Sequence, residues 1–135
     1  MVCLDTSFLI DVIRGKKEIV KIEEEIDLKE EIVAIATPTI VELIRGLYLK
    51  ANIKNIKKEE VEVINKKLSS FTILDLDKDS AVLAGEIEAD LINKGEIIDL
   101  EDIMIAAIAI SNDQNLLTKN KKHFEKIKGL QIETY

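Results

Sequence analysis

Short apolar runs alternate with longer stretches of helical periodicity along the whole chain. The apolar runs predict five strands, at residues 2–4, 32–36, 71–76, 116–117 and 130–134. Apolar positions at helical spacing predict helices at residues 8–13, 17–26, 40–50, 54–68, 79–93, 99–111 and 121–127. Such alternation is typical of an α/β fold, in which helices connect the strands of a parallel sheet.

Polar side chains follow the predicted strands at the edge of the sheet where ligands bind. Asp5 comes directly after the first strand, Glu42 lies just past the second, and Asn120 lies just past the fourth. Asp102 lies at the start of the apolar helix that leads into the fourth strand. Because the carboxyl ends of parallel strands meet at one edge, we expect these four side chains to face one rim.

Length and composition indicate one globular domain over residues 1–135. Apolar residues make up 47% of the chain, which is ample for a core, and charged residues make up 33%. The single cysteine excludes a disulfide scaffold and favours a reducing, cytoplasmic compartment. The longest apolar run, 103–110, is far shorter than a membrane span, so we expect no membrane partner. The first residues lack the features of a signal peptide.

The net charge of −7 argues against a general nucleic-acid coat protein, which needs a basic face. It is compatible with an enzyme that meets a phosphodiester through bound cations. With one histidine and one cysteine, any metal must be held by oxygen, as Mg²⁺ and Mn²⁺ are. Asp5, Glu42 and Asp102 are the candidate ligands, and Asn120 completes the ring through its amide oxygen or a water. A divalent ion so held neutralises the phosphate and generates hydroxide at neutral pH.

Each of these side chains also has a structural alternative. Glu42 could form a capping box with the threonine three residues before it. Asp99 could cap the apolar helix, with Asp102 stabilised by the helix dipole. Asp5 could cap the helix after the first strand, for which Thr6 is another candidate cap.

Four segments carry a family resemblance: VCLDTSFLIDVIRG, TPTIVELIRG, IIDLEDIMIAAIAI and LLTKNKKHFEKIKGL. In order and spacing they resemble the signature segments of PIN domains, above all the VapC toxins of VapBC toxin–antitoxin pairs. The likeness covers residues 2–132. It implies a three-layer α/β/α sandwich with a parallel sheet of four or five strands. It also implies a magnesium-dependent endoribonuclease toxin that hydrolyses tRNA or rRNA, with Mn²⁺ as a substitute metal.

The resemblance also assigns roles to particular residues. It makes Asp5, Glu42 and Asp102 the acidic metal-binding residues, with Thr6 as the polar residue beside the first of them. Thr118 and Asn120 belong to the fourth segment. At the position of Asn120 some family members have an acid, and this chain departs from them. Asp99 lies one helical turn before Asp102, where we expect a helix cap or an outer contact to the metal.

Basic side chains near the rim are candidate contacts for RNA. Lys119, Lys121 and Lys122 could hold the RNA backbone by charge, or could belong to a solvated loop. Arg14 and Arg45 lie late on predicted helices, where they could contact phosphate or a partner, or simply complement the helix C-terminus.

The early helices carry more apolar side chains than one core face can bury. This surplus favours a surface for protein partners, and the alternative is simple burial between adjacent helices. The resemblance implies a homodimer mate and a VapB-like antitoxin that places a basic side chain in the acidic pocket. Two alternatives keep the fold: a nuclease of RNA processing without a toxin role, and an inactive PIN-like module that binds partners. The one histidine, His123, is expected on a short surface helix without a catalytic role.

Overall fold

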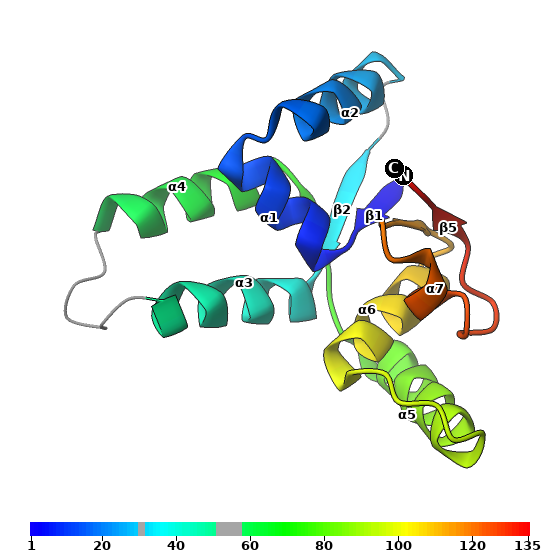
Figure 1. Ribbon diagram of the computed structural model, residues 1–135. Helices are drawn as coiled ribbons and strands as arrows, with labels where there is room; N and C mark the ends of the chain where they lie inside the picture. The colour runs from blue at the N-terminus through cyan, green and yellow to red at the C-terminus, as the bar shows by residue number, and fades with distance from the viewer. Residues whose placement is uncertain (30–31, 51–57) are drawn as a thin grey trace.

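The computed structural model describes residues 1–29, 32–50 and 58–135. These residues form a five-stranded sheet in the order β3-β2-β1-β4-β5, and every neighbouring pair of strands is parallel (Figure 1). The α/β prediction with a parallel sheet is therefore confirmed. The strands are β1 (Val2–Leu4), β2 (Val33–Ala36), β3 (Thr72–Leu74), β4 (Asn115–Leu117) and β5 (Ile132–Glu133).

Helices connect these strands in the predicted order. Residues 54–57 of the predicted fourth helix lie outside the described residues, and the helix is described from residue 58. None of the helices in the described part of the chain combines the length and apolar character that a bilayer span requires. The helices are α1 (Thr6–Arg14), α2 (Lys17–Leu28), α3 (Thr37–Lys50), α4 (Lys58–Leu68), α5 (Lys78–Asn93), α6 (Leu100–Ser111) and α7 (Lys121–Phe124).

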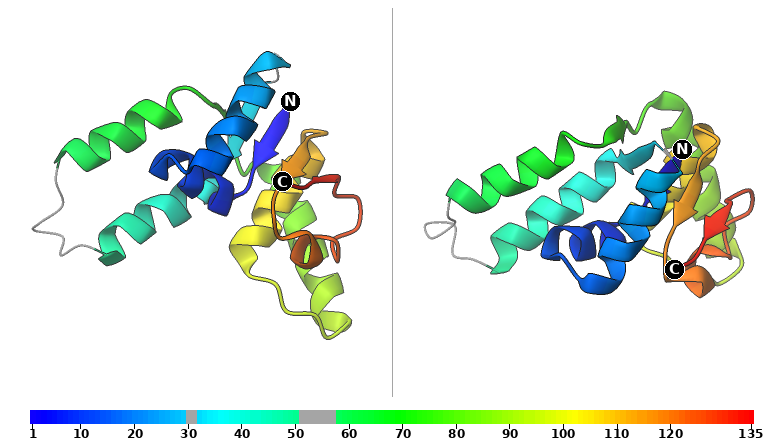
Figure 2. Two further views of the ribbon diagram at one scale, coloured as in Figure 1. Left: turned by 45° about the horizontal axis from the view of Figure 1, so that its top comes forward. Right: turned by 90° about the horizontal axis from the view of Figure 1, so that it is seen from above.

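Both faces of the sheet are covered by helices, which makes three layers. Along β1 the side chains alternate: Cys3 packs in the core formed with α5, α6 and α7, whereas Val2 and Leu4 pack toward α1 and α2. Ile35 of β2 packs in a further cluster with α1, α3 and α4. Figure 1 and both views of Figure 2 show α5, α6 and α7 on one side of the sheet and α1 to α4 on the other. The predicted α/β/α sandwich is confirmed.

The junctions after β1 and β2 are tighter than the hydrophobic pattern predicts. Asp5 is the N-cap of α1, so the helix begins at Thr6 rather than after it. The helix α3 begins at Thr37, directly after β2, which places Glu42 inside the helix. The capping-box alternative for Glu42 is therefore wrong, and its carboxylate is available for tertiary contacts.

The helix α6 is the central element of the core that α5, α6 and α7 form on one face of the sheet. Its side chains from Ile105 to Ala109 are fully buried, because they pack on α5 and on the sheet. Only its first turn, which carries Glu101 and Asp102, reaches the rim of the sheet.

Candidate functional site

Asp5 is held at the carboxyl end of β1 by two hydrogen bonds. Its Oδ1 accepts from the backbone N–H of Phe8 at 2.8 Å, which caps α1, and its Oδ2 accepts from the hydroxyl of Thr118 at 2.5 Å. The side chain is buried, with 5% of its residue surface exposed. Burial raises the pKa of Asp5 above its ordinary value, although both hydrogen bonds oppose this effect.

Glu42 reaches the same region from α3. Its Oε1 accepts from the hydroxyl of Thr6 at 2.8 Å, and the Thr6 hydroxyl also lies 3.4 Å from that of the fully buried Thr39. Partial burial raises the pKa of Glu42, and the charge of Asp102 raises it further. Thr6, the residue directly after Asp5, therefore links the first two carboxylates.

Asp102 lies in the first turn of α6, and its Oδ2 is 2.9 Å from Nε2 of His123 on α7. Burial raises the pKa of Asp102, the neighbouring charges of Asp99 and Glu101 add to this rise, and His123 opposes it. The charge of Asp102 in turn raises the pKa of Asp5.

We call Asp5, Glu42 and Asp102 the carboxylate cluster. Three chain segments contribute one member each, and the charge of Asp102 acts on both others. Groups that are partly buried and repel one another favour a bound cation, and their oxygens are the donors that hard divalent ions prefer. The donor chemistry of the cluster therefore fits Mg²⁺ or Mn²⁺.

The chain's own donors hold each carboxylate of the cluster. Asp5 is paired with Phe8 and Thr118, Glu42 with Thr6, and Asp102 with His123. Among residues 1–29, 32–50 and 58–135, no three histidine, cysteine or acidic side chains are arranged as a ready metal cage. Cation binding in this cluster would therefore require these side chains to leave the positions in which the chain's own donors hold them.

The remaining predicted residues of the rim play different parts. Thr118 is fully buried behind Asp5, and its hydroxyl accepts from the backbone N–H of Asn120 at 3.0 Å. The Asn120 side chain is exposed and does not cap α7. Asp99 holds the N-cap position of α6, but its side chain makes no capping hydrogen bond and is exposed.

Two of the basic candidates are engaged in ion pairs. The Arg45 guanidinium lies 2.7 Å from Glu101, which joins α3 to α6 beside the carboxylate cluster. The Lys119 ammonium lies 3.2 Å from the buried Asp11 of α1, which Lys16 also contacts at 2.9 Å. These pairs tie together the elements that carry the cluster.

The other three basic candidates lie at or near helix ends. Lys121 and Lys122 are exposed on α7, and Arg14 is the last residue of α1. Their side chains remain candidates for contact with phosphate.

His123 is the site residue that sequence reasoning missed. It lies 21 positions from Asp102 along the chain. Only the packing of α7 beside the first turn of α6 brings them together, and no local pattern encodes that contact.

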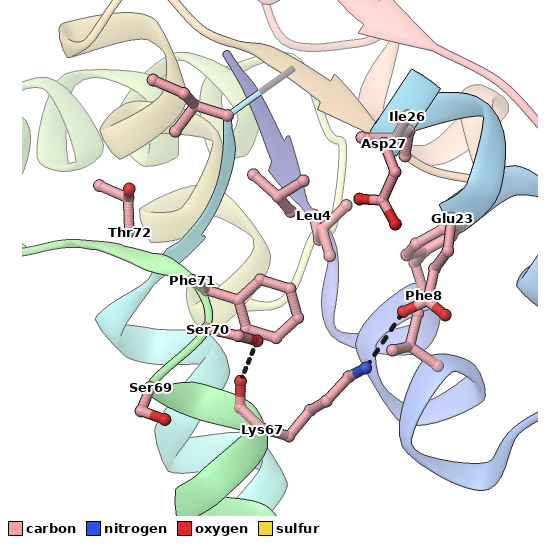
Figure 3. A pocket seen from close by; sticks show the side chains of 13 residues that line it. Leu4, Phe8, Glu23, Ile26, Asp27, Lys67, Ser69, Ser70, Phe71 and Thr72 are labelled. Atoms are coloured by element: carbon pink, nitrogen blue, oxygen red, sulfur yellow. Dashed lines mark hydrogen bonds and ion pairs between the residues drawn. The ribbon is translucent and has the colours of Figure 1, made fainter. Parts of the chain in front are cut away.

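Two cavities lie on the helical layer formed by α1 to α4. One, of about 680 Å³, opens among α1, α2 and the connection from α4 to β3, and contains the Lys67–Glu23 ion pair at 3.4 Å (Figure 3). It contains no member of the carboxylate cluster. The other, of about 640 Å³, lies among α1, α3 and α4 and reaches Glu42. Its lining is mainly apolar, with Ile13 and Leu47 among the side chains.

Comparisons with known proteins show the family of the chain. The PIN domain family matches residues 2–130. The chain is 33% identical to a tRNA(fMet)-specific endonuclease VapC of Salmonella typhimurium, over 98% of this chain and 96% of that protein. It is 37% identical to Ribonuclease VapC1 of Methanocaldococcus jannaschii, over 99% of this chain and 86% of that protein. The crystal structure of DNA-bound VapBC from Salmonella typhimurium superposes with a TM-score of 0.84 and 32% identity, covering 99% of this chain and 98% of that one.

Proposed function

The chain belongs to the PIN domain family and, within it, to the VapC ribonucleases, and from this premise we propose that Asp5, Glu42 and Asp102 bind Mg²⁺ for endoribonuclease chemistry. The observation that carries the proposal is the carboxylate cluster itself. Asp5, Glu42 and Asp102 come from three separate segments at the carboxyl edge of a parallel sheet, and the charge of Asp102 raises the pKa of both others. When bound there, a divalent ion supplies phosphate charge neutralisation and a water of lowered pKa.

The proposed reaction is in-line attack of water on an RNA phosphodiester, which leaves a 5′-phosphate and a 3′-hydroxyl. The chain's own residues prepare the site for it. Thr118 and the backbone N–H of Phe8 fix the orientation of the Asp5 carboxylate, and Thr6 fixes that of Glu42. These hydrogen bonds restrict the motion of the carboxylates, which lowers the entropy cost of bringing them together around a cation.

The proposed substrate is a structured RNA, tRNA or rRNA. Aromatic residues make up only 4% of the chain, so recognition by stacked bases is poorly supported and the RNA backbone and shape must carry more of it. The exposed Lys121 and Lys122 on α7, beside the rim, are the side chains we assign to backbone phosphates. Because Lys119 and Arg45 pair with acids of the chain, we assign them first to holding the site together.

We place a VapB-like antitoxin on the apolar cavity among α1, α3 and α4. Its lining is mainly apolar, and its charged members are three acids, Glu42, Glu59 and Glu60, and one base, Arg14. An amphipathic antitoxin segment with basic side chains complements both features, and such charge complementarity speeds association. Because the cavity reaches Glu42, the same segment could present a basic group to the carboxylate cluster.

We assign the exposed apolar side chains on the outer side of α3 and near the start of α6 to a homodimer contact. Val41 and Leu49 on α3 are 57% and 78% exposed, and Ile97 and Leu100 are 93% and 48% exposed. Exposed apolar patches of this kind mark contact surfaces in soluble proteins.

RNA cleavage by the purified protein tests the proposed function. We expect cleavage in Mg²⁺ or Mn²⁺, none in excess EDTA, and loss in Glu42→Gln and Asp102→Asn. The matched control is Glu86→Gln, which removes an exposed acid on α5 and should cleave like the wild type. Full cleavage in EDTA, or by the Asp102→Asn variant, contradicts the proposed cation site.

Induction in cells separates the toxin role from the alternatives. A toxin arrests growth only when its carboxylate cluster is intact, and mapping of RNA ends then identifies the substrate. A nuclease of RNA processing cleaves without arrest, and an inactive module does neither.

A further inference from the structure

His123 contacts the carboxylate cluster but has no part in the chemistry proposed above. Its Nε2 lies 2.9 Å from Oδ2 of Asp102, and both side chains are 26% exposed. An ionised carboxylate can only accept a hydrogen bond, so with Asp102 ionised the contact requires the proton on Nε2. The imidazole is therefore a donor to Asp102 and is not placed as a free base.

The position of the imidazole is set by the core rather than by solvent. Its ring meets the ring of Phe124 edge to face, with centroids 5.3 Å apart and an interplanar angle of 89°. Phe124 is 2% exposed and packs in the same core cluster as α5 and α6, and Ile127 beyond it is 3% exposed. The backbone N–H of His123 also donates to the carbonyl of Asn120 at 3.2 Å. The packing of α7 in the core therefore fixes the position of the ring that contacts Asp102.

Asp102 is surrounded by other acidic side chains. It lies in the first turn of α6 beside the acids Asp99 and Glu101, and its charge acts on Asp5 and Glu42. Like charges on several sides favour rotation of the carboxylate away from the cluster. His123 is the neighbour whose 2.9 Å contact with Oδ2 fixes the orientation of Asp102.

We propose that His123 is a positioning residue that holds Asp102 through Nε2–H, and thereby sets how tightly the carboxylate cluster binds a divalent cation. The inference rests on the proposed function. The contact uses Oδ2 of Asp102 and leaves Oδ1 for the cation. Outer hydrogen-bond partners of metal ligands typically change metal affinity by about 10–100-fold when removed.

Calorimetric Mn²⁺ binding to two variants tests the proposal. His123→Phe keeps an aromatic ring against Phe124 but removes the donor, and we expect it to weaken Mn²⁺ binding about 10–100-fold. His123→Gln can place an amide nitrogen near the position of Nε2, and we expect affinity near that of the wild type. The control Glu125→Gln, which removes an exposed acid of the same region, should bind like the wild type.

The Mg²⁺ requirement of cleavage gives a second readout. For His123→Phe we expect a higher Mg²⁺ concentration at half-maximal rate, with the maximal rate at saturating Mg²⁺ largely kept. A general loss of packing would lower the maximal rate instead. Unchanged Mn²⁺ affinity in His123→Phe overturns the inference, even where wild-type binding and its loss in Asp102→Asn uphold the cation site. A wild-type chain that binds no Mn²⁺ overturns the proposed function and the inference with it.

A measurement on the wild-type chain does not depend on any variant folding. Because the chain has one histidine, its imidazole gives a single set of nitrogen signals in a long-range ¹H–¹⁵N spectrum. We expect the proton on Nε2 and a shift of these signals on addition of Mg²⁺. A ring protonated only at Nδ1, or one that does not respond to Mg²⁺ at concentrations that support cleavage, overturns the proposal.

Discussion

Asp5 combines two roles that a pair of substitutions can separate. Its carboxylate is proposed to bind the cation, and it also caps α1 and accepts from the buried Thr118 hydroxyl. Asp5→Asn keeps an oxygen for the Phe8 N–H and a polar nitrogen that can bond the Thr118 hydroxyl oxygen. Asp5→Ala removes both contacts. Both variants remove the same buried charge.

The difference in stability between the two variants follows from these contacts. Loss of an N-cap hydrogen bond costs about 1 kcal/mol. Asn at position 5 can still donate to the Thr118 hydroxyl oxygen, whereas Ala leaves this fully buried hydroxyl without a side-chain partner, which costs about 1–3 kcal/mol. We therefore expect Asp5→Ala to be about 2–4 kcal/mol less stable than Asp5→Asn. With the usual unfolding entropy per residue and 135 residues, this corresponds to about 7–14 °C in Tm.

The buried charge of Asp5 makes the difference in stability between Asp5→Asn and the wild type depend on pH. Burial raises the pKa of Asp5 in the folded chain above 3.8, so folding favours the protonated form. The stability that this group contributes is present below the unfolded pKa and is lost as the pH rises through the folded pKa. Without metal, Asp5→Asn should therefore gain stability relative to the wild type as the pH rises from about 3.8 toward neutrality.

Thermal unfolding in EDTA, followed by circular dichroism, measures these stabilities, and RNA cleavage in Mg²⁺ measures function. Loss of a metal ligand removes several kcal/mol of transition-state stabilisation, so both variants should lose cleavage by at least about a hundredfold. Equal stability of the two variants would refute the structural role assigned to Asp5. Substantial cleavage by Asp5→Asn would refute the role assigned to its charge.

Three further predictions concern other parts of the chain. Thr6→Val removes the donor to Glu42 at 2.8 Å, and we expect the free energy of unfolding in urea to fall by about 1.5–3 kcal/mol and cleavage to slow. Unchanged stability and cleavage would contradict the link between Thr6 and Glu42. Gly15 ends α1 at φ 66°, so Gly15→Ala should cost about 1–2 kcal/mol in thermal unfolding, and a neutral result would show that the turn relaxes. Val63, 58% exposed on α4, lines the apolar cavity, so Val63→Lys should weaken antitoxin binding at least about tenfold in calorimetry, by an unfavourable basic–basic contact, without loss of cleavage; unaltered binding would place the antitoxin elsewhere.

Strand positions and the parallel sheet were predictable, because β1 and β2 are short apolar runs that end directly before a polar residue, and the other strands contain or adjoin apolar residues. The rim residues followed from this topology, since Asp5 comes directly after β1 and Asp102 opens α6. The strand ends were predicted less exactly: the pattern predicts a strand at 71–76, and only Thr72–Leu74 forms β3, where it pairs with β2.

Contacts between distant segments were not predictable from local patterns. Glu42 carries a capping-box signature, yet α3 begins at Thr37 and the side chain turns to Thr6 instead. Arg45 was expected to complement a helix end or to meet a partner, and it pairs with Glu101 across two helices. Such pairings depend on how helices pack, which composition and periodicity do not specify.

The position of a bound cation tests the central claim most directly. Crystals of the wild-type protein soaked in Mn²⁺ would show it by anomalous scattering. We predict a single strong peak with oxygens of Asp5 and Asp102 at about 2.0–2.3 Å and Glu42 beside them, directly or through water. Active protein whose Mn²⁺ binds elsewhere, with the three carboxylates still held by the chain's own hydrogen bonds, would contradict the account.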